Sequence, residues 1–330
     1  MNKLVLLSIF IASLSATAQS SYLLRADGST DTYELIKNSG FFPETSGNLT
    51  PDEFMGHSGY RHISQIYDSV LAEYVFAFDI HVDYQEGSTN VTDGNKAELV
   101  DRQRNEIKCM SDVPGTVASA GETVTYRWKF MLPKGMKTTS EFCHIHQIKG
   151  MGSGEEVAHP VFTITCRSTS SSRQVLQVIN VPYEGAANVN LAQLDLAPLL
   201  GKWIQVTETI TVGQQGAYRL HMTDVDSGSV ILSLNKPNIA VWRFTDDNST
   251  MRGKWGIYRS LGTDLQLVSQ LRSERVLFAD IEASKTDAAV ESILVDEDET
   301  DSTLYDLMGR SVSNPVPGLY IQKGRKIIIR

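Results

Sequence analysis

The sequence predicts an all-β protein: an antiparallel β-sandwich followed by a small C-terminal β-unit. Short segments with alternating apolar and polar residues recur along the chain, and turn residues separate them. The clearest segment, 122–132, places Tyr126, Trp128 and Phe130 on one face and polar residues on the other. Long segments with helical periodicity are lacking, and many short strands without long helices are typical of a sandwich.

The expected elements follow one another through the domain. An irregular segment, 21–60, is rich in glycine and proline and is expected to wrap the edge of the domain. In 73–82, Phe76, Phe78 and Ile80 alternate with other residues, so one face of this strand packs in the core. A short helical turn is expected over 192–201 and a hairpin turn over 226–228. The remaining expected strands are 62–67, 160–167, 174–181, 203–212, 218–223, 230–235 and 277–282.

Both ends of the chain differ from this domain in composition. Residues 1–18 combine Lys3, an apolar run over 4–14 and Ala-Thr-Ala at 16–18. This is the pattern of a secretory signal peptide, and it is too short for a membrane span. The sequence therefore predicts a secreted or cell-surface protein without a transmembrane segment. The domain is expected over 19–282, an acidic linker over 283–302 and the small β-unit over 303–330.

Composition restricts the partners and the chemistry. The 330 residues carry a net charge of −9, which argues against a nucleic-acid partner, so an anionic ligand would need a local cluster of Arg and Lys. Cys109, Cys143 and Cys166 are an odd number of cysteines, so at least one is unpaired unless it bridges chains; a Cys143–Cys166 disulfide is left open. Their spacing matches no zinc motif. No metal site is expected in the chemistry, and a structural calcium ion is left open.

Three expected strands, far apart in the chain, each have an unusually polar face. In 252–259, Lys254, Gly256 and Tyr258 point to one side, and Trp255 and Ile257 point to the other. Because glycine weakens a strand interior, Gly256 indicates a close approach to the backbone, as in the floor of a binding groove. An ordinary solvated strand face is the alternative interpretation of this segment.

The two other strands repeat the pattern. In 102–108, one face carries Arg102, Arg104, Glu106 and Lys108, and the other carries Gln103, Asn105 and Ile107. In 141–150, strict alternation puts Gln147 and Lys149 on one face and His144 and His146 on the other. A polar face that recurs in three strands predicts one shared binding surface.

In this order, the three segments resemble the jelly-roll polysaccharide lyases, in particular alginate lyases and heparin lyase I. The matching pieces are R-N-E at 104–106, Q-I-K at 147–149 and K-W-G-I-Y-R at 254–259. The resemblance implies a jelly-roll sandwich that cleaves a uronic-acid polysaccharide by β-elimination and requires no cofactor. Where those families have a histidine two residues after the glutamine, this chain has Lys149.

β-Elimination needs a group that neutralises the uronate carboxylate, a base that removes the C5 proton and an acid that protonates the departing O4. By resemblance, Tyr258 is the acid, and the neighbouring Lys254 tunes it and helps to bind substrate. Arg104 and Gln147 fit the neutralisation of the uronate carboxylate. Asn105 could join them if its strand is bulged. Glu106 orients Arg104.

The base stays open at this stage. His146 titrates in the right range but is expected on the face opposite Gln147. Lys149 shares the face of Gln147 but needs a lowered pKa, and Tyr258 could act as both base and acid. His144 and Arg167 complete the set of predicted substrate-binding residues.

Two other functions are weighed against the lyase. A non-catalytic carbohydrate-binding jelly-roll protein would use the same sheet without a reaction. A sandwich glycoside hydrolase is less favoured, because it needs two carboxylates at a defined separation and the chain has no E-x-D-x-x-E strand.

The last residues resemble the C-terminal sorting domain of the type IX secretion system of Bacteroidetes. The matching pieces are Y-D-L-M-G-R at 305–310, G-L-Y-I at 318–321 and the basic stretch 323–326. The resemblance implies contact with a secretion machinery through this tail, which would take no part in the chemistry.

Overall fold

The structure, a computed structural model, divides the chain into two compact units, Met1–Ala288 and Ala289–Arg330. It describes residues 20–45, 49–55, 60–82, 94–95, 99–152, 158–170, 172–241, 249–263, 266–286, 304–305, 311–312, 318–322 and 325–329. The predicted signal peptide and most of the predicted acidic linker lie outside these residues.

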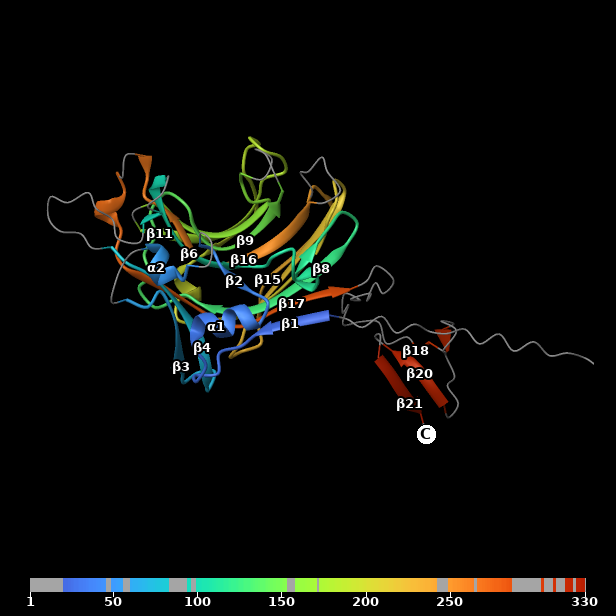
Figure 1. Cartoon of the computed structure of the whole chain (residues 1–330). Helices are drawn as coiled ribbons and strands as arrows, with labels where there is room; N and C mark the ends of the chain where they lie inside the picture. Colours follow the sequence, from blue (N-terminus) through green and yellow to red (C-terminus); the bar gives the residue numbers. More distant parts are fainter. Residues whose placement is uncertain are drawn as a thin grey trace, which may run out of the picture. The chain divides into compact units, whose positions relative to one another are not determined.

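In the larger unit, two antiparallel β-sheets form a sandwich, which confirms the predicted fold class (Figure 1). The first sheet has the strand order β15-β14-β13-β8-β17-β4-β3, with β1 paired to β17. The second sheet has the order β12-β11-β10-β9-β16-β6-β2, with β5 paired to β6 and β7 to β16. Strand β16 therefore lies inside the second sheet, between β9 and β6.

The strands of the first sheet are β1 (Ser20–Leu24), β3 (Ile63–Asp68), β4 (Glu73–Ile80), β8 (Thr123–Met131), β13 (Trp203–Thr211), β14 (Gly216–Asp224), β15 (Val230–Ile239) and β17 (Glu274–Thr286). Those of the second are β2 (Phe42–Pro43), β5 (Gly94–Asn95), β6 (Leu99–Lys108), β7 (Val117–Ala118), β9 (Cys143–Met151), β10 (Phe162–Ser170), β11 (Arg173–Asn180), β12 (Val189–Asp195) and β16 (Thr250–Ser260). The described helices are short: α1 (Thr32–Asn38), α2 (Pro51–Met55), and the 3-10 turns η1 (Pro114–Thr116), η3 (Ala197–Leu199) and η5 (Val268–Gln270).

The hydrophobic core lies between the two sheets and is rich in aromatic residues. Trp128 and Phe130 of β8 and Trp255 of β16 are fully buried there, on the faces that alternation predicts. The expected short helical turn over 192–201 is confirmed in part: Ala197–Leu199 form the 3-10 turn η3, whereas residues 192–195 belong to β12, which pairs with β11.

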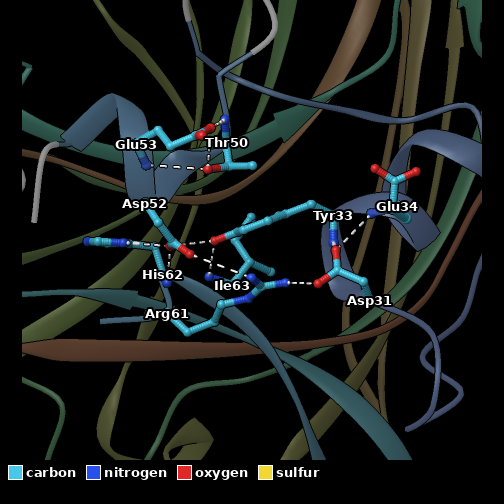
Figure 2. A network of polar contacts seen from close by, with 9 residues as sticks. All are labelled: Asp31, Tyr33, Glu34, Thr50, Asp52, Glu53, Arg61, His62 and Ile63. Carbon is cyan, nitrogen blue, oxygen red and sulfur yellow. Dashed lines mark hydrogen bonds and ion pairs between the residues drawn. The ribbon is translucent and has the colours of Figure 1, made fainter. Parts of the chain in front are cut away.

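The N-terminal segment is fastened to the sandwich by a polar network (Figure 2). Asp31 caps the start of α1, since its side chain accepts from the backbone N–H groups of Tyr33 and Glu34. The carboxylate of Asp52 in α2 accepts from the Tyr33 hydroxyl at 2.6 Å and contacts Nδ1 of His62 at 2.9 Å. Helices α1 and α2, which precede and follow β2 in the chain, are both held by these contacts.

The three cysteines are buried free thiols. Cys143 and Cys166 are register partners on β9 and β10 and are not joined by a disulfide. In the described part of the chain, no helix has the length and apolar character needed to span a membrane.

The smaller unit contains one antiparallel sheet with the strand order β19-β18-β20-β21. Its strands are β18 (Leu304–Tyr305), β19 (Ser311–Val312), β20 (Gly318–Gln322) and β21 (Arg325–Ile329). This sheet is the small C-terminal β-unit that the sequence predicts. The stretch 306–310 of the sorting-domain resemblance lies outside the described residues.

Candidate functional site

Strands β16 and β6 place their predicted polar residues on one face of the second sheet, which we call the polar face. Three cross-strand pairs align them: Lys254 with Lys108, Gly256 with Glu106, and Tyr258 with Arg104. The register of these two strands is regular, so Trp255 and Ile257 point to the core, where both are fully buried. The alternation predicted for both strands is confirmed.

Gly256 is needed because the chain itself approaches closely there. Its φ is +148°, and a Cβ at this position would lie 2.1 Å from the backbone oxygen of Asn105 on β6. The close approach expected at this glycine is therefore made by the neighbouring strand.

Strand β9 departs from strict alternation at Ile145. Against β16, Gln147 pairs with Lys254 and His144 pairs with Tyr258. Against β10, the residues on either side of Ile145 face consecutive residues, so Ile145 is an extra residue in β9. This irregularity turns His144 onto the polar face beside Tyr258, so the prediction that His144 and His146 share a face is wrong.

His146 lies in the core, on the side opposite the polar face. Its side chain is 1% exposed, and its Nε2 lies 2.7 Å from the buried Glu208 carboxylate. The rings of Trp128 and Trp255 lie 5.0 and 5.1 Å from the imidazole. Because the sheet separates it from the polar face, His146 does not lie where a substrate on that face would need a base.

Asn105 also points to the core side of its strand. Its Nδ2 donates to the backbone oxygens of His62 at 2.7 Å and Asp79 at 2.8 Å. Asn105 would reach the polar face only if β6 were bulged, and β6 keeps a regular register with β16. Asn105 therefore ties β6 to the first sheet and does not contact a substrate on the polar face.

Tyr258 lies among cationic and aromatic groups. The guanidinium carbon of Arg104 lies 4.6 Å from the centre of the phenol ring, and Nη1 of Arg102 donates to the phenol oxygen at 2.8 Å. The rings of His144 and Phe142 lie 5.7 and 5.1 Å from that of Tyr258. The phenol is thus held between two guanidinium groups and a histidine.

A buried network lies further along the same face. Nζ of Lys254 is 2.9 Å from Oε2 of Glu106, and Nε2 of Gln147 donates to Oε1 of the same carboxylate. All three residues are about 1% exposed. Glu106, expected to orient Arg104, binds Lys254 and Gln147 instead.

Glu44, in the segment after β2, is a site residue that sequence reasoning missed. Its carboxylate lies 3.1 Å from Lys108, 3.4 Å from Arg104 and 3.5 Å from Lys254. Its backbone N–H also donates to the backbone carbonyl oxygen of Glu106 at 2.7 Å. Burial acts to raise the pKa of Glu44, but the charges of Lys254 and Lys108 outweigh it and hold that pKa far below its usual value. Without local periodicity around Glu44, the sequence carried no signal for it.

Arg167 and His144 are two further predicted site residues, and both lie on the polar face. Thr165 pairs with His144, so Arg167, two residues further along β10, shares the polar face. Burial, followed by the charges of Arg167 and Lys254, lowers the pKa of His144 to about 3. His144 is therefore a neutral imidazole near neutral pH.

Lys149 lies on the polar face at a distance from Tyr258. It pairs with Arg252, six residues before Tyr258 on β16, and six strand residues span roughly 20 Å. Burial, followed by the charges of Lys254 and Arg104, lowers the pKa of Lys149 to about 8. The position of Lys149 suits contact with a second part of a long ligand better than proton transfer at the same centre as Tyr258.

Within the described ranges, no group of three or more His, Cys, Asp or Glu residues is arranged to hold a metal ion. The arrangement can instead bind an anion and move protons, using its cations, one phenol and one neutral imidazole.

No protein-family model matches the chain, and no curated protein matches it. Among solved structures, an endo-β-1,4-glucuronan lyase from Trichoderma reesei is similar, with 16% identity, a TM-score of 0.45, and 70% of this chain and 92% of that chain covered. An alginate lyase from Aplysia kurodai has 9% identity, a TM-score of 0.44 and coverages of 73% and 97%. An alginate lyase from Pseudomonas aeruginosa has 14% identity, a TM-score of 0.42 and coverages of 69% and 88%.

Proposed function

We propose that this protein is an exported polysaccharide lyase that cleaves a uronic-acid polymer by β-elimination. The observation that carries the proposal is the surrounding of Tyr258, where Arg102, Arg104 and His144 contact one phenol on the polar face. A proton donor, an anion-binding group and a neutral proton acceptor are the three parts that this reaction needs.

Charge on the polar face favours an anionic polymer. The protein has a net charge of −9, but cationic side chains outnumber acidic ones on this face. Arg104, next to Tyr258, is the group we assign to the uronate carboxylate at the reacting sugar. A bound carboxylate that shares its charge with a guanidinium makes the adjacent C5–H bond more acidic.

The proton transfers can then be assigned. His144 is neutral at working pH and accepts the C5 proton, and the C–H electron pair forms the C4–C5 double bond. The C4–O4 bond breaks, and the Tyr258 hydroxyl gives its proton to O4. An anionic substrate in the site favours the protonated imidazole, which offsets the lowered proton affinity of His144. Tyr258 serving as both base and acid is the alternative that the sequence left open.

The other residues of the polar face bind the rest of the polymer. Lys254 and Gln147, fixed by Glu106, lie on one side of Tyr258, and Lys149 lies beyond them. Arg167 lies on the β10 side of His144. A chain of sugars across β16 would contact these groups in turn.

The test is ultraviolet absorbance during incubation with a panel of alginate, glucuronan, ulvan and heparin. Elimination alone creates a conjugated C4–C5 double bond, so product absorbance identifies the reaction. Binding to one of these polymers without any absorbance would replace the proposal with a non-catalytic carbohydrate-binding protein.

Export and surface attachment belong to the same proposal. They are supported by the pattern of 1–18 and by the resemblance of the last residues to a secretion sorting domain. Cleavage after residue 18 and release into the medium are measurable by N-terminal sequencing of the secreted protein.

A further inference from the structure

We infer that Arg102, held by Asp101, is a positioning residue that orients the Tyr258 phenol and stabilises the negative charge left on it after proton transfer. This inference rests on the proposed function and goes beyond the sequence motif, because Arg102 lies outside R-x-E. Three contacts, one for each guanidinium nitrogen, carry it.

Each of the three nitrogens of the Arg102 guanidinium makes one hydrogen bond. Its Nε donates to Oδ1 of Asp101 at 2.8 Å and its Nη2 donates to Oδ2 at 2.9 Å, a two-pronged contact with one carboxylate. The remaining nitrogen, Nη1, donates to the Tyr258 oxygen at 2.8 Å. These contacts use three of the five N–H groups and fix the guanidinium between Asp101 and Tyr258, which separates the task of Arg102 from that of Arg104.

The direction of the Arg102–Tyr258 hydrogen bond matters for the reaction. A guanidinium has only donors, so the phenol oxygen must be the acceptor, and its own proton is not used in this contact. The hydroxyl hydrogen of Tyr258 is therefore left to point away from Arg102, toward a sugar on the polar face.

The same contact becomes stronger during the reaction. As Tyr258 gives its proton to O4, negative charge develops on the phenol oxygen, and a positioned cationic donor stabilises that charge more than it stabilises the neutral phenol. The Tyr258 ring is also covered by Arg104 at 4.6 Å and edged by His144 at 5.7 Å, so rotation of the phenol away from Arg102 is restricted. The contribution of Arg102 should thus appear in kcat.

The experiment compares Arg102→Gln, Arg102→Lys and Asp101→Asn with the wild-type full chain on whichever polymer of the panel gives product. For Arg102→Gln we expect kcat to fall about 10²-fold while KM changes less than about twofold, as for loss of one donor to a developing oxyanion. Arg102→Lys keeps the charge and should retain more turnover than Arg102→Gln. Asp101→Asn should lower kcat about tenfold, because Arg102 keeps its charge but loses its fixed orientation.

A matched control separates this effect from general loss of structure. Arg275 and Asp79 form the same two-pronged pair in the first sheet, at 2.7 and 2.9 Å. Arg275→Gln should change the melting temperature about as much as Arg102→Gln and leave kcat unchanged. Added guanidinium chloride at about 50 mM, but not sodium chloride, should restore part of the turnover of Arg102→Ala, since the small cation replaces the lost donor.

Three results would overturn the inference: normal kcat in Arg102→Gln, a loss confined to KM, or an equal loss of kcat in Arg275→Gln. If the wild type itself gives no product from any polymer of the panel, the proposed function is wrong, and the inference, which rests on it, is wrong as well. Failure of the inference alone is recognised by an active wild type with an equally active Arg102→Gln.

Discussion

At the scale of single residues, the proposed chemistry depends on one hydroxyl group. Tyr258 is 9% exposed, and its ring packs against Phe142 and His144. Tyr258→Phe keeps these ring contacts and removes only the oxygen, so the free energy of unfolding should change by about 1 kcal/mol or less.

Turnover of Tyr258→Phe should fall by about 10²–10⁴-fold, the range typical of a lost general acid, whereas affinity for the polymer should fall no more than about tenfold. The measurements are product absorbance and binding to the same polymer. Tyr67→Phe, at a tyrosine that is 60% exposed, is the matched control and should behave like the wild type. Full turnover in Tyr258→Phe would show that the proton donor lies elsewhere.

The histidine next to Tyr258 predicts an unusual pH dependence. Burial, Arg167 and Lys254 lower the pKa of His144 from 6.5 to about 3, so the imidazole stays unprotonated far below neutral pH. An ordinary histidine base would make kcat/KM fall below about pH 6.5. We expect no such fall from His144 down to about pH 5, measured as initial rates at low substrate concentration. An acid limb near pH 6.5 that disappears in His144→Gln would contradict the assignment.

The same shift predicts how stability depends on pH. Between about pH 3 and 6.5 the unfolded chain binds a proton at His144 that the folded chain does not, so the free energy of unfolding decreases as the pH falls through this window. Urea unfolding at several pH values should show a smaller decrease for His144→Gln than for the wild type.

At the scale of elements, the N-terminal segment contributes a charge to a site built by three distant strands. Glu44 contacts Lys108, Arg104 and Lys254, and the Asp52 network fastens the segment around it. Glu44→Gln should lower the free energy of unfolding by about 1–3 kcal/mol, because the buried Lys254 and the partly buried Arg104 and Lys108 lose a carboxylate partner.

The same substitution makes the polar face more positive. The added attraction for an anionic polymer is on the order of 1 kcal/mol for one charge near the surface, so KM should fall a few-fold. Glu34→Gln, at an exposed acid on α1, is the control and should change neither quantity. An increased KM in Glu44→Gln would show that Glu44 helps to bind the substrate.

At the scale of the whole molecule, the local charge opposes the net charge. The polar face attracts an anionic polymer, whereas the whole protein, with a net charge of −9, repels it. Binding should therefore be sensitive to salt. Raising the salt from about 0.05 to 0.5 M shortens the screening length to a few ångströms, so KM should rise while kcat stays nearly constant. A KM that does not change with salt would argue against an anionic substrate.

The division into two units predicts that the C-terminal sheet is dispensable for folding and for the reaction. Deleting 289–330, the smaller unit, should leave kcat and the melting temperature of the sandwich nearly unchanged, because a separate unit has its own core. Loss of folding after this truncation would mean that the tail contributes structure to the larger unit.

Local patterns in the sequence determined the fold class and the faces of two site strands. Apolar alternation in 122–132 and 73–82 correctly predicts core strands, because side chains in a strand alternate wherever it pairs. For the same reason, Arg104 and Glu106 of β6 share one face with Lys254 and Tyr258 of β16, and Tyr258 lies beside Arg104 as expected.

Only the tertiary structure decided the rest of the site. An extra residue at Ile145 moves His144 to the polar face, and such a bulge depends on how β9 pairs with both of its neighbours. His146 remains inside because its partner, Glu208, comes from the opposite sheet, and Glu44 reaches the cations from a segment about 60 residues before Arg104. Contacts between residues so far apart in the chain follow from the packing of whole sheets, and alternation within a single strand does not predict that packing.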